Sequence, residues 1–221
     1  MGGMEIVSKK VLPAISVGII VWLVTFLVGY KLPIPYVPLV VAYFALWIIT
    51  FVLANARMPT LAFLTYILSC IITGILTSPL IEWMLGLPRI TLVVARNIII
   101  ISLLSASIGV SLGAYFGWLK RDYVLSHTEI LLFTIALCFC IIFVEIIVVI
   151  LLGKEWVFLW TSVGVIIAML IFSIIDGAEL REIVEYDPEL WMVAVIDFFL
   201  DFVNIVIRLI YILAKIYSEK D

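Results

Sequence analysis

Charged side chains are scarce in this chain: Asp, Glu, Lys and Arg make up 13% of its 221 residues, whereas hydrophobic residues make up 66%. A soluble domain of this size carries about twice that share of charge and far less apolar side chain. The few charges contain no long basic run and sum to a net charge of −3, which argues against a nucleic-acid-binding surface. The composition therefore predicts an integral membrane protein whose main partner is the lipid bilayer.

Cysteine is also rare. The three cysteines, Cys70, Cys138 and Cys140, all lie within apolar segments and form no CxxC pair. This pattern excludes a disulfide framework and a CxxC metal or redox motif, and we expect no resident cofactor.

Seven apolar segments are each long enough to span a bilayer, which takes about 20 residues. They cover residues 11–30, 37–54, 60–80, 91–117, 129–152, 156–176 and 190–214. The connections are short and leave no room for an extramembrane domain. The first segment has no small-residue cleavage site, so we interpret it as a retained span and not as a signal peptide. The sequence thus predicts one all-α domain over residues 1–221, a bundle of seven transmembrane helices.

The distribution of Lys and Arg gives a slight excess on the side of the N-terminus, which favours an N-terminus inside the cell. The chain is rich in Ile and Val and poor in cysteine and in loops, as is typical of a prokaryotic plasma-membrane protein.

Small residues recur every fourth position in the fourth segment, at Ser105, Gly109, Gly113 and Gly117. Such a stripe lets another helix approach closely. We favour packing within the chain over a dimer interface, and therefore a monomer.

The last segment carries a stripe of polar residues. Its members are Asp197, Asp201, Asn204, Arg208 and Lys215. Their spacing places them on one face of a helix. Because polar groups within a membrane must face a protein interior or water, the last helix should lie at the centre of the bundle.

Asp176 closes the preceding segment, so that it and Asp201 lie on two consecutive helices of a hairpin. Two close carboxylates in a medium of low dielectric constant do not both remain ionised, so such a pair would share a proton and respond to pH. A structural alternative remains open, in which Asp201 only caps Asn204 or pairs with Arg208.

Three arginines and one glutamate complete the candidate residues. Arg57 lies between the second and third segments, on the same side as Asp176, and is either a latch to that carboxylate or a residue that sets topology. Arg96 and Glu145 fall at matching depth on the fourth and fifth segments. We expect them to form a buried structural ion pair, with Arg208 as a further candidate member.

Two stretches carry a resemblance to a known family: residues 162–180 (SVGVIIAMLIFSIIDGAEL) and residues 193–209 (VAVIDFFLDFVNIVIRL). They resemble the transmembrane Bax inhibitor motif family, whose members end the sixth helix with an aspartate and carry an LDFxN segment in the last helix. Residues 72–81 and 109–122 give weaker matches. Together these stretches span most of the chain, and only the first two helices lack a motif.

The resemblance implies a seven-helix bundle with a central last helix and a pH-sensitive calcium leak controlled by two aspartates. Asp176 and Asp201 are their counterparts here, and Arg57 is nearest to an arginine latch. Asp197, Arg96 and Glu145 are not part of the family pattern.

The leading interpretation is therefore a calcium-permeable leak that responds to protons. Calcium prefers oxygen ligands, and the Asp176–Asp201 pair, with Asp197 and Asn204 as a further ion path, would supply them. So few carboxylates do not make a tight site, which suits conduction.

Other functions remain to be weighed. Intramembrane aspartyl proteases need a GxGD motif, which precedes neither Asp176 nor Asp201, and His127 has no GxSG partner for serine chemistry. We therefore expect no enzyme. A proton-coupled transporter and a non-conducting scaffold stay open, although the sequence has no interrupted helix pair or internal repeat.

Overall fold

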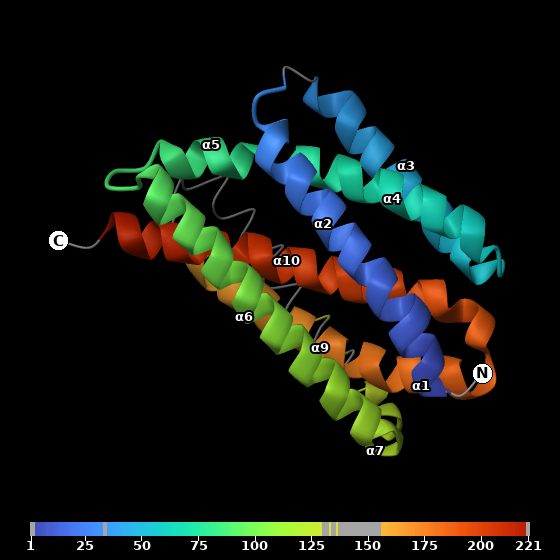
Figure 1. Ribbon diagram of the computed structural model, residues 1–221. Coiled ribbons are helices and arrows are strands. Elements are labelled where there is room, and N and C mark those ends of the chain that lie inside the picture. The colour runs from blue at the N-terminus through green and yellow to red at the C-terminus, as the bar shows by residue number, and fades with distance from the viewer. Residues whose placement is uncertain (1–2, 33–34, 130–132, 134–135, 137–155, 220–221) are drawn as a thin grey trace. The chain divides into compact units, whose positions relative to one another are not determined.

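The computed structural model describes residues 3–32, 35–129, 133, 136 and 156–219. Within these ranges all regular structure is helical (Figure 1), and six helices are long and apolar enough to cross a membrane. These candidate spans are Val7–Gly29, Tyr36–Asn55, Pro59–Leu85, Leu92–Leu119, Leu159–Tyr186 and Pro188–Ser218. They correspond to six of the seven predicted segments. The remaining one, residues 129–152, lies outside the described residues apart from three single positions.

Several helices begin at or beside a proline. A short α1 and a π-helical turn precede α2, and a 3-10 turn precedes α10. The bounds are α1 Gly3–Ile6, α2 Leu12–Gly29, α3 Tyr36–Asn55, α4 Pro59–Thr77, α5 Pro79–Leu85, α6 Leu92–Leu119, α7 Arg121–Ser126, α9 Trp156–Tyr186 and α10 Trp191–Ser218. Pro59 is the first residue of α4, and Pro35 immediately precedes α3. A proline at such a position loses no helical hydrogen bond, because the first N–H groups of a helix have no partner within it.

The chain divides into two compact units, and α9 and α10 contribute to both. Unit 1 comprises Met1–Trp83 and Glu179–Phe199, and unit 2 comprises Met84–Ala178 and Leu200–Asp221. In unit 1, α4 packs against both α2 and α3. Gly74 makes the contact with α2 possible, because a methyl group there would overlap the Thr25 side chain and the Trp22 backbone.

Buried polar bonds join these helices. The Trp47 indole N–H donates to the Thr73 hydroxyl at 3.2 Å, and Thr50 and Ser69 share a hydrogen bond of the same length. Inside a membrane such bonds contribute to helix association, because lipid offers no competing partner. The Trp47 ring also stacks on Phe199 of α10, with ring centroids 5.7 Å apart.

In unit 2, the small-residue stripe of α6 lies against α9. A methyl group at Gly109 would lie 2.9 Å from Leu170, and one at Gly113 would lie 3.1 Å from the Ser173 Cβ. One at Gly117 would overlap the backbone of Ile174. This confirms that the stripe serves packing within the chain. Because the contacts advance in the same direction along both helices, α6 and α9 run parallel.

Candidate functional site

Asp176 on α9 and Asp201 on α10 are the only charged side chains that are buried among the described residues. Their exposed fractions are 8% and 5%. A carboxylate so far from water in an apolar helix pair is tolerated only where protein groups interact with it. Both residues belong to unit 2.

One group that binds Asp201 is the hydroxyl of Ser173. Its Oγ donates to Asp201 Oδ2 at 2.7 Å and also lies 2.9 Å from the carbonyl oxygen of Met169, one turn earlier in α9. Ser173 and Asp176 are three residues apart on α9 and so lie on the same side of that helix. We refer to Asp176, Ser173 and Asp201 together as the aspartate cluster, because Asp176 lies one turn along α9 from the serine that bonds to Asp201.

The hydroxyl of Ser173 has one proton for two acceptors. When Asp201 is ionised, Ser173 donates to the carboxylate. When Asp201 is protonated, its own O–H donates to the Ser173 Oγ, and the serine proton turns to the Met169 carbonyl. The cluster therefore keeps a hydrogen bond in both protonation states while its net charge changes.

Glycines allow α6 and α9 to approach closely beside this cluster. Gly113 of α6 leaves room for Ser173, and Gly177, directly after Asp176, lies against the backbone of Ala114. Sequence reasoning did not select Ser173, because a single serine in an apolar helix usually bonds to its own backbone. The signal that would have identified it is its spacing of three residues from Asp176.

The remaining polar residues of α10 differ in their surroundings. The Asn204 amide donates to the Leu200 carbonyl of its own helix at 2.8 Å. Asp197 is half-buried in unit 1, where Glu179 of α9 interacts with it electrostatically. Asp197 and Asp201 are thus one turn apart but belong to different units.

Arg57 forms an ion pair that the sequence did not indicate. Its Nη2 donates to Asp187 Oδ2 at 2.6 Å, which joins the α3–α4 link to the α9–α10 link within unit 1. The sequence left open whether Arg57 is a latch to Asp176 or a residue that sets topology, and the Asp176 pairing stays a prediction.

The backbone at Arg57 is strained. Its φ is +58°, and the N–H groups of Arg57 and Met58 donate to the carbonyls of Ala54 and Leu53. In this helix-ending pattern the left-handed position is usually glycine, because a side chain costs about 1 kcal/mol there.

Residues 5–218 match a protein family described as inhibitor of apoptosis-promoting Bax1. The match covers nearly the whole chain, including the first two helices, for which the sequence motifs gave no assignment. The chain belongs to this Bax inhibitor family. Membership confirms the resemblance that the LDFVN segment indicated, and with the six apolar helices it makes the chain a multi-pass integral membrane protein. No curated protein matches it.

In this Bax inhibitor family protein, one expected ion pair includes a residue outside the described part of the chain. We expected Arg96 in a buried ion pair with Glu145, but Arg96 is exposed on α6. Glu145 lies outside the described residues, so the pairing itself stays a prediction. Arg208 is half-buried on α10 and interacts with other groups.

The described residues contain no group of three or more His, Cys, Asp or Glu side chains placed to hold a metal ion. The aspartate cluster offers two carboxylates and one hydroxyl, whereas calcium takes six to eight oxygen ligands in its stable sites.

The strain at Arg57 leads to a stability prediction. Arg57→Ala keeps the left-handed backbone and loses the ion pair, so we expect the free energy of unfolding to fall by about 1 kcal/mol. Arg57→Gly also loses the pair but relieves the strain, so its stability should stay near that of the wild type. Thermal unfolding in detergent measures both. Equal losses in the two variants would show that the backbone conformation of Arg57 carries no strain.

Proposed function

We propose that this protein is a pH-sensitive, calcium-permeable leak channel gated by Asp176 and Asp201, and not an enzyme. The observation that carries the proposal is the burial of both carboxylates on two apolar helices, with Asp201 bonded to the Ser173 hydroxyl. A buried pair of acids gains or loses charge with pH, and its oxygens suit a hard cation.

The proposed gate has two states. With a proton on the pair, the cluster carries less charge, its hydrogen bonds are satisfied and the path is closed. With both carboxylates ionised, they repel each other and attract a divalent cation, so the path opens. Flux should therefore rise as the pH rises.

The proposed topology has seven spans, an N-terminus inside a prokaryotic plasma membrane, and α10 at the centre. Two observations support it. Parallel spanning helices such as α6 and α9 require an odd number of crossings between Leu119 and Trp156, and the apolar sequence 129–152 fits one. In the most apolar stretch of α10, 61% of the residues are buried, against 17–44% in the other described spans.

Arg57 is the proposed latch, with Asp187 as its partner. The Arg57–Asp187 pair holds the link between the two helices that carry the aspartates. An exposed pair of this kind contributes little to stability, about 0–1 kcal/mol, so it can open without unfolding the protein.

Calcium flux into proteoliposomes between about pH 6 and pH 8 tests the proposal, with empty liposomes as the baseline. We expect protein-dependent flux that rises with pH, and flux without pH dependence in the double variant Asp176→Asn/Asp201→Asn. Reconstituted protein without flux at any pH would contradict the channel and favour a scaffold. Proton movement coupled to a solute would favour a transporter.

A further inference from the structure

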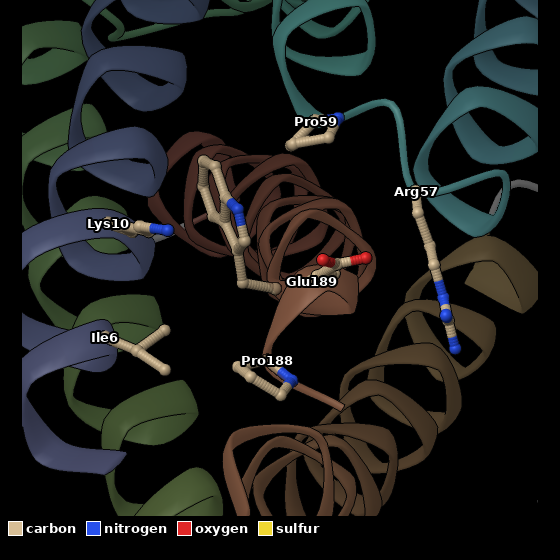
Figure 2. Close-up of a pocket in the computed structure, with 7 residues that line it drawn as sticks. Ile6, Lys10, Arg57, Pro59, Pro188 and Glu189 are labelled. Atoms are coloured by element: carbon tan, nitrogen blue, oxygen red, sulfur yellow. The ribbon is translucent and has the colours of Figure 1, made fainter. Parts of the chain in front are cut away.

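A cavity of about 460 Å³ lies in unit 1, where α2, α4 and α10 begin. Figure 2 shows Lys10 on one side of it and Arg57 on the other, with Pro59, Pro188 and Glu189 between them. Because three membrane spans start here, the cavity lies at the border between the bilayer and water, on the side of the N-terminus. We call it the headgroup cavity.

A second hollow of about 470 Å³ adjoins it and shares Lys10, Pro59 and Trp191 as lining residues. It extends between α2 and α4 to Val17 and Phe63. Val17 is two turns further into the span than Lys10 and is 41% exposed, so this acyl groove opens toward lipid. The two hollows form one depression with a polar end and an apolar end.

The charges at the polar end are unevenly matched. Lys9 pairs with Glu5, and Arg57 pairs with Asp187. The Lys10 ammonium lies 5.9 Å from the centre of the Trp191 ring, and within the described part of the chain no carboxylate forms an ion pair with it. Its positive charge therefore lies at the cavity, and Arg57, whose guanidinium has further donors besides the one that bonds to Asp187, lines the opposite side.

We propose that this depression binds one anionic phospholipid whose headgroup carries hydroxyl groups, such as phosphatidylglycerol. The phosphate lies between Lys10 and Arg57, and the headgroup hydroxyls donate to the Glu189 carboxylate. One acyl chain lies in the acyl groove against Val17 and Phe63, where it covers apolar surface. Basic pockets between transmembrane helices bind anionic headgroups by this chemistry, and interfacial Trp and Lys side chains suit this depth.

Native mass spectrometry of the purified protein tests the site without relying on ion conduction. Equal amounts of phosphatidylglycerol, phosphatidylethanolamine and phosphatidylcholine with the same acyl chains are added separately. We expect the first complex with phosphatidylglycerol to be at least about fivefold more populated than the other two, the effect of one interfacial cation.

The variants separate this site from general lipid coating. Lys10→Gln should lower phosphatidylglycerol binding about fivefold. Lys31→Gln is the matched control, because it also removes one positive charge but lies beyond the other end of α2. Like Lys10, Lys31 lies near an aromatic ring: its ammonium is 5.5 Å from the centre of the Tyr30 ring. This control should leave binding unchanged. Val17→Trp should fill the acyl groove and lower the binding of the lipid while Lys10 stays in place.

Three results would overturn the proposal. Equal losses in Lys10→Gln and Lys31→Gln would mean that lipid binds wherever charge is available. Equal binding of the three lipids to the wild type would remove the role of the anionic headgroup. Displacement of phosphatidylglycerol by millimolar inorganic phosphate would assign the cavity to a soluble anion.

Discussion

Gly177→Ala is expected to lower the free energy of unfolding by about 3 kcal/mol, one of the largest losses that a single methyl group can cause in this protein. The added carbon would lie 2.6 Å from the Ala114 Cα and would overlap the Ala114 carbonyl oxygen. Both atoms are backbone, so no side chain can rotate away, and α6 and α9 must separate. We expect a clear fall in melting temperature and in the yield of monodisperse protein in detergent.

Gly164→Ala provides the matched control on the same helix. Among the described residues, no atom other than the chain neighbours and the adjacent backbone of α9 itself lies within 4 Å of a methyl group at that position. Alanine is also the better helix former by about 1 kcal/mol, so the control should be as stable as the wild type or slightly more stable. If both variants lose stability equally, the loss in Gly177→Ala does not come from the close approach of α6 and α9.

Asp201→Asn is expected to abolish most of the pH dependence of calcium flux, because it removes one of the two groups whose charge changes. Ser173→Ala should have a graded effect. Its hydroxyl bonds more strongly to an ionised carboxylate than to a protonated one, by about 1.4 kcal/mol, so removing it should move the midpoint of the flux–pH curve upward by about one pH unit. Flux measured in proteoliposomes at half-unit pH steps resolves such a shift.

Ser107→Ala is the control for Ser173→Ala. The Ser107 hydroxyl also bonds to a carbonyl of its own helix, that of Leu103, but it is exposed on α6. Its loss should leave the flux–pH curve in place. A curve that is the same in Ser173→Ala as in the wild type would show that the hydroxyl does not act on the Asp201 proton equilibrium.

Much of the fold was predictable because bilayer thickness sets the length of every span. The apolar segments located the described spans, and the four-residue spacing of Gly109, Gly113 and Gly117 indicated a close helix contact. The sequence could not predict which helix packs against these glycines, because many apolar helices have a suitable surface. Only the structure identifies α9 as the partner and gives its parallel direction.

The site was predictable to a similar degree. Asp176 and Asp201 stood out because an acid within a membrane span is costly. Ser173 did not stand out, because its partner lies 28 positions away on another helix and a serine hydroxyl is inexpensive to bury against its own backbone. The Arg57–Asp187 pair was missed for a related reason. Both residues lie in links between helices, where the hydropathy pattern does not indicate which residue a side chain contacts.

The parallel contact between α6 and α9 has a consequence for biogenesis. Neighbouring antiparallel helices can pair as soon as the second one leaves the ribosome, but a parallel pair cannot form until the chain between them has been inserted. During synthesis the glycine face of α6 is therefore exposed to lipid or to the insertion machinery for an extended interval. The rate of translation between Leu119 and Trp156 then sets how long this glycine face can form non-native contacts with other helices.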